Sequence, residues 1–123
     1  MITKDHLRAE GLARRKALDR AWRADASAAI RRNILESPRL REAQTVSLYA
    51  SMGYEVQTHP LIAALLELRK TVVLPRVVHW RHELELHAVD AFPDGCEPGD
   101  FGILEPMPQA HPRVVDAAEL DLI

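Results

Sequence analysis

The sequence predicts a single α/β domain that spans residues 1–123. A β-branched and aromatic run at 45–50, TVSLYA, precedes a helical segment at 58–69 and a second apolar run at 71–74, TVVL. A strand, a helix and a strand within about 30 residues form a βαβ unit, whose two strands are parallel. With 123 residues, 47% of them hydrophobic, the chain has the length and the apolar content of one packed domain.

Two helices are expected before this unit. Residues 4 to about 22 contain Leu, Ala, Arg and Lys at a density typical of a helix, and a second helix is expected at 25–35. Pro38 ends that helix, because the residue before a proline avoids helical backbone angles.

The rest of the chain predicts shorter elements. Thr58 is suited to cap the helix at 58–69, and the alternating run at 83–89 predicts an exposed strand. The segment 93–112, rich in Pro and Gly, predicts little regular structure. Asp116 is suited to cap a short helical turn, after which 121–123 resembles the start of a buried strand. The domain is therefore expected to be incomplete at its C-terminus.

Composition excludes several classes of protein. No run of about 18 apolar residues is present, so no transmembrane helix is expected. The first residues are charged throughout, unlike a secretory signal. Cys96 is the only cysteine and cannot form an internal disulfide, which fits a reducing cytoplasm. We therefore expect a cytoplasmic protein that does not enter a membrane.

Charge is unevenly distributed along the chain. Residues 1–42 carry a net charge of +5, whereas residues 43–123 carry −7. This asymmetry indicates either an anionic ligand at the N-terminal segment or attraction between the two segments within the fold.

One face of the first predicted helix is basic. At 100° per residue, Lys4, Arg8, Gly11 and Arg15 lie within about 40° of one another. Lys and Arg donors on one ridge suit an oligophosphate, and a glycine allows close approach to the helix. The alternative is a solvated face with ion pairs inside the helix.

Two loops carry further candidate residues. Glu55 follows the end of a predicted parallel strand, where ligands bind in open α/β sheets, and its carboxylate can accept N–H groups of a ligand. Phe101, between two glycines, can stack on a flat heterocycle or hold its loop down as a hydrophobic plug. The histidines at 79, 82 and 87 lack the spacing of metal sites, and Cys96 has no basic neighbour to activate it.

Six short segments of the sequence form a recognisable series: KDHLR at 4–8, ARRKAL at 13–18, VSLYA at 46–50, EVQT at 55–58, VLPR at 73–76 and GDFGILEP at 99–106. In this order they resemble the 5-formyltetrahydrofolate cyclo-ligase family. The closing AELDLI at 118–123 also resembles this family. The resemblance covers the whole chain.

The resemblance implies a Rossmann-like three-layer fold with a mostly parallel sheet, and an enzyme that uses ATP and Mg²⁺. The family converts 5-formyltetrahydrofolate to 5,10-methenyltetrahydrofolate. By the same resemblance, Lys4 and Arg8 contact ATP, and Ala50 and Glu55 line the folate pocket. For the third basic contact, alignment indicates Arg14 and helical geometry indicates Arg15. No protein residue is assigned to a metal, and the pattern sets no oligomeric state.

Family members continue into a glycine-rich loop that holds the ATP phosphates, and residues 1–123 do not include this loop. Activity of the chain alone is therefore not expected. The alternatives are a non-catalytic protein that binds folate or a nucleotide, and a nucleic-acid-binding protein. The basic segment lacks interleaved aromatic residues and the remainder is acidic, which disfavours nucleic acid.

Overall fold

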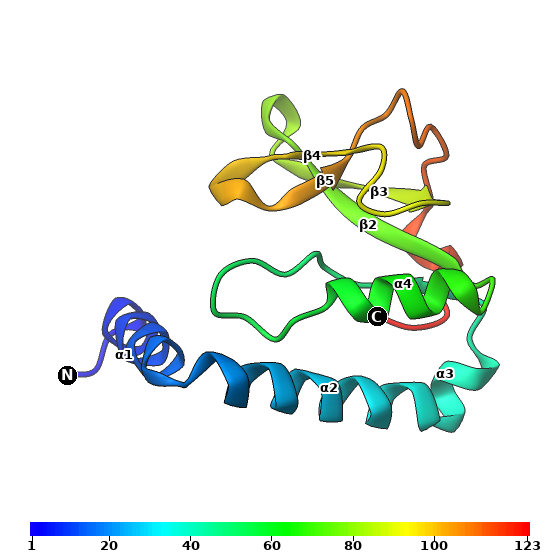
Figure 1. Ribbon diagram of the computed structural model, residues 1–123. Coiled ribbons are helices and arrows are strands. Elements are labelled where there is room, and N and C mark those ends of the chain that lie inside the picture. Colours follow the sequence, from blue (N-terminus) through cyan, green and yellow to red (C-terminus); the bar gives the residue numbers. More distant parts are fainter.

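The computed structural model describes all residues, 1–123, as an α/β fold (Figure 1). Its helices and strands are, in chain order, α1 (Lys4–Ala17), α2 (Arg20–Glu36), α3 (Pro38–Glu42), β1 (Thr45–Ser47), α4 (His59–Glu67), β2 (Thr71–Val78), β3 (Glu83–Val89), β4 (Cys96–Pro98) and β5 (Leu104–Pro106). Short 3₁₀ turns lie at His79–Arg81, Asp100–Gly102 and Ala117–Glu119.

The predicted βαβ unit is confirmed. β1 and β2 pair in parallel with Val46 opposite Val72, and α4 connects them. β3 then pairs antiparallel with β2 over its full length, as a hairpin. Beyond the other edge of β1, Leu122 forms a parallel bridge with Val46, as expected for the closing segment. The sheet is therefore mixed, with parallel neighbours on both sides of β1.

The N-terminal helices divide elsewhere than predicted. The helix expected at 4–22 ends at Ala17, because Leu18 and Asp19 have extended backbone angles, and α2 starts at Arg20. Asp19 occupies the N-cap position of α2, which separates the two helices three residues before the predicted end. Pro38 ends α2 as predicted but also opens the short helix α3, where a proline is tolerated in the first turn.

Two further boundaries differ from the prediction. β1 is shorter than 45–50, and β2 extends to Val78 because β3 pairs with it throughout. The segment 93–112 contains the hairpin of β4 and β5, with Cys96 opposite Pro106. This hairpin packs on β2, where the Glu105 carboxylate accepts the backbone N–H of Val77 at 2.8 Å.

The core lies between α4, α3 and the sheet. Its fully buried side chains include Leu40 of α3, Ile62 and Leu65 of α4 and Val72 and Leu74 of β2. Figure 1 shows α2 on the side of α4 that faces away from the hairpin, with α1 projecting from its start. α1 itself contains no buried residue.

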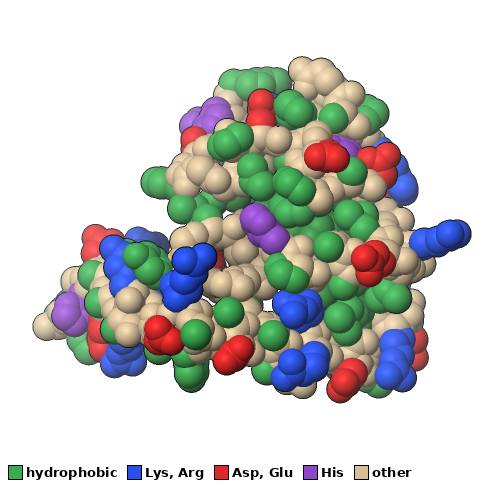
Figure 2. Space-filling view, in the orientation of Figure 1, with side chains coloured by type: hydrophobic (Ala, Val, Ile, Leu, Met, Phe, Trp, Pro, Cys, Tyr) green, Lys and Arg blue, Asp and Glu red, His purple; other side chains and the backbone are tan.

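The outer surface differs between the helices and the sheet. Figure 2 shows hydrophobic side chains gathered where the sheet, the hairpin and α4 meet, and charged side chains of both signs over the helices. None of the helices combines the length and the hydropathy needed to cross a membrane.

Candidate functional site

The loop between β1 and α4 is closed by a pair of reciprocal hydrogen bonds. The Ser51 N–H donates to the Thr58 hydroxyl at 2.9 Å, and the Thr58 N–H donates to the Ser51 hydroxyl at 2.9 Å. The Thr58 hydroxyl in turn donates to the Tyr49 carbonyl at 2.7 Å. Thr58 therefore stands at the N-cap position as predicted, but its hydroxyl closes the loop instead of capping α4.

Glu55 lies inside this loop. Its Oε1 accepts the Met52 N–H at 3.0 Å, and its own N–H donates to the Met52 carbonyl at 3.2 Å. Gly53, between them, has φ +56°, a left-handed value that glycine adopts without strain. The tight turn leaves the second carboxylate oxygen free of bonds to the chain, so Glu55 can accept a donor from outside.

A hollow of about 370 Å³ opens beside the loop, lined by seven residues that include Met52, Glu55 and His59. The His59 ring is held by the Ser51 carbonyl, 3.0 Å from its Nε2, and it meets the Phe92 ring edge-on at 5.0 Å. The hollow is of a size that small ligands occupy.

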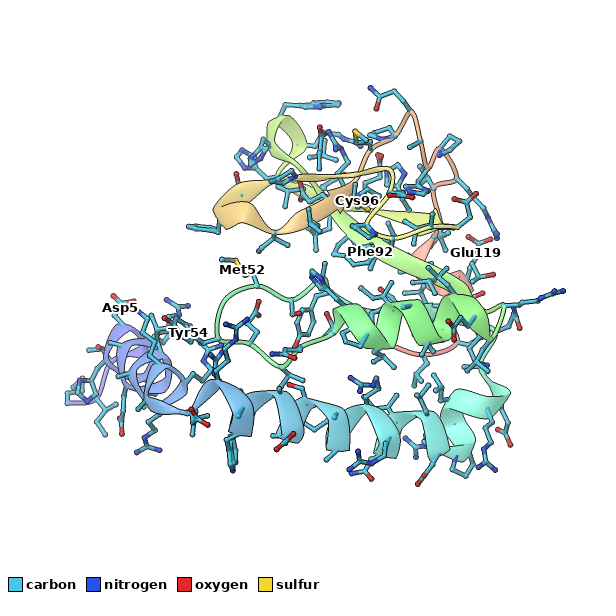
Figure 3. All side chains as sticks on the ribbon, viewed as in Figure 1. Asp5, Met52, Tyr54, Phe92, Cys96 and Glu119 are labelled. Atoms are coloured by element: carbon cyan, nitrogen blue, oxygen red, sulfur yellow. The ribbon has the colours of Figure 1, made fainter.

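Tyr54 joins the loop to the corner between α1 and α2. The Lys16 ammonium lies 5.7 Å and the Arg23 guanidinium 5.0 Å from the centre of the Tyr54 ring. Both distances are within the range of cation–π attraction. Arg23 also donates to the Gly53 carbonyl at 3.5 Å. Figure 3 shows Tyr54 reaching from the loop toward α1, so the basic helix and the Glu55 loop are adjacent.

The basic ridge is exposed to solvent along α1. Arg8 pairs with Asp5 at 3.2 Å, which leaves it on the surface with 75% of its side chain exposed. Lys4 forms no ion pair. No atom lies within 4 Å of the place where a side chain on Gly11 would begin, so space is available for a ligand along the ridge.

Arg14 and Arg15 differ in what they face. Arg14 pairs with Glu10 on the outer side of the helix, at 2.5 Å. Arg15 instead acts on Tyr49: burial and the Glu55 charge raise the pKa of the Tyr49 hydroxyl, and the Arg15 charge opposes that rise. The charges of Arg15 and Glu55 therefore act on the same hydroxyl in opposite directions.

Ala50 lies at the base of the loop, 3% exposed, directly before Ser51. Its small side chain is part of the hydrophobic core cluster. The structure therefore places it next to the loop and under the surface, not in the open hollow beside Glu55.

Phe101 stands at the tip of the β4–β5 hairpin. With 85% of its surface exposed and a left-handed φ of +58°, it does not act as a hydrophobic plug. The hairpin is shaped by Gly99, where a Cβ atom would come 2.1 Å from the Glu105 carboxylate. Asp100 pairs with His79 at 3.4 Å, which ties the tip to the turn after β2.

The histidines and Cys96 do not form a metal site or a reactive thiol. His87 is 1% exposed, and its ring nitrogens contact Glu85 and the His111 carbonyl, whereas His79 contacts Asp100. No group of three or more His, Cys, Asp or Glu side chains converges on a point that could hold a metal ion. Burial raises the pKa of the Cys96 thiol, which makes it a poor nucleophile.

Sequence reasoning missed the contacts that join these pieces. Arg23 acts on residues of a loop that lies 30 positions further along the chain, and Ser51 and Thr58 bond to each other across seven positions, so no local pattern predicts either contact. An aromatic residue beside a loop glycine was the one hint available for Tyr54.

Comparison with known proteins identifies the relatives of this architecture. The sequence profile of the 5-formyltetrahydrofolate cyclo-ligase family matches residues 1–123. The solution structure of Aquifex aeolicus 5,10-methenyltetrahydrofolate synthetase superposes with a TM-score of 0.83 at 28% sequence identity, over 99% of this chain and 59% of that protein. The chain thus spans about three fifths of that relative's length. No curated protein sequence matches the chain.

Proposed function

The chain belongs to the 5-formyltetrahydrofolate cyclo-ligase family, and on that basis we propose that it serves the ATP-dependent cyclisation of 5-formyltetrahydrofolate to 5,10-methenyltetrahydrofolate. The observation that carries the proposal is the adjacency of the basic helix α1 to the Glu55 loop through Tyr54. An oligophosphate on the ridge and a heterocycle beside Glu55 would then be neighbours.

The residues of the chain divide between the two ligands. Lys4 and Arg8, with Arg15 as the third cation, contact the ATP phosphates. Glu55 accepts an N–H group of the folate with its free carboxylate oxygen, and Ala50 shapes the base of the loop. Phe101 is exposed at the hairpin tip, where it can stack on a flat ring.

The reaction requires charge neutralisation at the group that is transferred. The formyl oxygen of the substrate takes up the terminal phosphoryl group of ATP as ADP leaves. The neighbouring amine then attacks the activated carbon and loses its proton, and phosphate leaves as the ring closes. Cations fixed on one ridge stabilise the charge on the transferring phosphoryl group. Lys4, Arg8 and Arg15 supply these cations.

Mg²⁺ normally accompanies phosphoryl transfer and is held mainly by phosphate oxygens, water and one or two carboxylates. The chain presents no converging set of three ligating side chains. We assign no residue of the chain to Mg²⁺, which phosphate oxygens and water can hold.

The test is a binding and turnover assay with ATP, Mg²⁺ and 5-formyltetrahydrofolate, in which the methenyl product is followed by its absorbance. Turnover supports the proposed reaction. Binding of both ligands without turnover supports the alternative of a non-catalytic binding protein. Calorimetry that detects neither ligand contradicts the proposal.

Paired variants separate the two ligands. Lys4→Ala or Arg8→Ala should weaken ATP binding about tenfold or more, since each removes a charge-assisted contact of roughly 1.5–3 kcal/mol. Glu55→Ala should weaken folate binding and spare ATP, whereas Glu55→Gln keeps one acceptor oxygen and should do less harm. Arg32→Ala, on the exposed surface of α2, is a matched control. Equal affinities in all variants would leave α1 and the loop without a role in binding.

A further inference from the structure

A second hollow lies at the opposite end of α4 from the Glu55 loop. It measures about 420 Å³ and is lined by the α4–β2 connection at 66–71, the end of β3 at 88–90 and the segment 110–113. In Figure 1 the two ends of α4 point in opposite directions, toward the Glu55 loop and toward the start of β2. The hollow is thus separate from the site described above.

Cationic side chains predominate around this hollow. Three of its lining side chains, Arg69, Lys70 and Arg113, are cationic, and Asp90 is the one carboxylate. Residues 43–123 as a whole carry −7. Three of the five cations of that segment thus line one hollow.

The two arginines have no partner within the chain. Neither the Arg69 nor the Arg113 guanidinium is within 4.0 Å of a carboxylate. Lys70 is already used, because its ammonium donates to the Ala43 carbonyl at 2.5 Å. Asp90 faces His111, 3.4 Å from its Nδ1, and not the arginines. Ten N–H donors of two guanidinium groups, five on each, are thus left for solvent or a ligand.

Arg69 also has an unfavourable backbone conformation. It follows the end of α4 with φ +59°, where its N–H donates to the Leu66 carbonyl at 2.9 Å and the next N–H to the Leu65 carbonyl at 3.1 Å. Glycine is the preferred residue at this position of such a helix ending. A cation near a helix C-terminus is favourable, but that does not explain why Arg113 from a distant segment lines the same hollow.

We propose that this hollow binds the phosphate group of a small ligand through Arg69 and Arg113. Each guanidinium presents a planar fork that pairs with two oxygens. Two forks arriving from different segments suit a tetrahedral phosphate, whose oxygens point in several directions. A carboxylate offers only two oxygens in one plane. The volume is within the range of small-molecule sites.

The experiment is a titration of the isotopically labelled chain with inorganic phosphate, with pyrophosphate and with acetate, followed by amide chemical shifts. The two phosphates should shift the amides at 66–71, 88–90 and 110–113 in a saturable manner. Acetate should shift them far less. Equal responses to acetate and phosphate would overturn the assignment of a phosphate, and no response at these amides would overturn the site.

Two variants distinguish a loss of phosphate binding from a loss of folding. Arg113→Ala should weaken phosphate binding at these amides about tenfold or more, and Arg32→Ala should not change it. Arg69→Gly should weaken binding too, yet raise the melting temperature, because glycine adopts the left-handed conformation without strain. Unchanged affinity in Arg69→Gly and Arg113→Ala would overturn the proposal.

The same titration also tests the proposed nucleotide site. Shifts confined to amides of α1 would support phosphate binding at Lys4 and Arg8 and refute phosphate binding in the hollow. Shifts confined to amides around the hollow would support the hollow and count against the ridge. The two proposals therefore fail independently.

Discussion

Replacement of the buried His87 should destabilise the fold strongly. The ring is 1% exposed on β3, and each of its nitrogens lies 2.7 Å from an acceptor: Nδ1 from the His111 carbonyl and Nε2 from Glu85 Oε1. One side chain thus ties β3 to the segment that follows β5. Next to it, Val115 donates to the Leu86 carbonyl at 2.8 Å, so the same segment is held to the sheet by backbone bonds.

The magnitude follows from what His87→Ala leaves behind. A buried acceptor without a donor costs about 1–3 kcal/mol, and this applies fully to the His111 carbonyl. Glu85 keeps Arg81, whose guanidinium lies at 2.9 Å, and 26% of its side chain remains in solvent, so its loss is smaller. With the cavity left by the ring, the free energy of unfolding should fall by about 2–4 kcal/mol.

The pH dependence gives a second readout. The hydrogen bond from His87 is the main cause that lowers the pKa of Glu85, with a further contribution from Arg81. Because the pKa is lower in the folded state, Glu85 adds stability above its ordinary value of 4.5, and this stability is lost as the pH falls through the folded pKa. The difference between wild type and His87→Ala should therefore be largest above pH 4.5 and narrow in acid.

Urea unfolding followed by far-ultraviolet circular dichroism, repeated from acid to neutral pH, measures both effects. His6→Ala is the control, since 64% of that side chain is exposed and it should unfold like wild type. A loss below about 0.5 kcal/mol, the usual range of a surface substitution, would refute the reasoning, as would a difference that does not change with pH.

Three further predictions concern the loop, helix α1 and the C-terminal segment. Tyr54→Ala should speed hydrogen exchange of α1, which has no buried residue and is held at Lys16; equal exchange rates in variant and wild type would show that other contacts hold the helix. Arg15→Ala should weaken ATP binding more than Arg14→Ala, because Arg15 shares a face of α1 with Lys4 and Arg8 and its charge acts on Tyr49 beside the loop; calorimetry in which Arg14→Ala has the larger effect would reverse the assignment. Asp121→Asn should make stability fall less steeply in acid. Hydrogen bonds from the backbone N–H groups of Thr45 and Gln44 lower the pKa of Asp121, so the stability that its carboxylate contributes is lost as the pH falls through that pKa. An unchanged acid transition in the variant would count against this prediction.

The parts of the fold that the sequence predicted correctly rest on local signals. The βαβ unit follows from two apolar runs and an amphipathic segment, and the turn at Ala117–Glu119 has the capping box that Asp116 and Glu119 form. The break after Ala17 was missed because Leu18 and Trp22 continue a helical spacing in composition alone. Propensity gives no warning when two helices are separated by only two residues.

The hairpin of β4 and β5 was missed for a different reason. Its strands are three residues long, contain prolines and show no alternation. What fixes them is Glu105 on the backbone of β2 and Arg76 of β2, which lies 3.3 Å from Glu97. Such pairings join segments about twenty to thirty residues apart, where neither propensity nor periodicity carries information.

In the candidate site, too, the sequence predicted which residues share a face but not how far apart the groups lie. Helical geometry predicted that Lys4, Arg8 and Arg15 share a face, because their spacing sets their angles. It contained nothing about how far that face lies from Glu55, which the structure sets through Tyr54, Lys16 and Arg23. α1 buries no residue of its own, and the contacts of the Tyr54 ring with Lys16 and Arg23, together with the hydrogen bond from Arg23 to the Gly53 carbonyl, join the α1–α2 corner to the loop. Substitutions at that ring should therefore affect the coupling of the two ligands more than the affinity for either one alone.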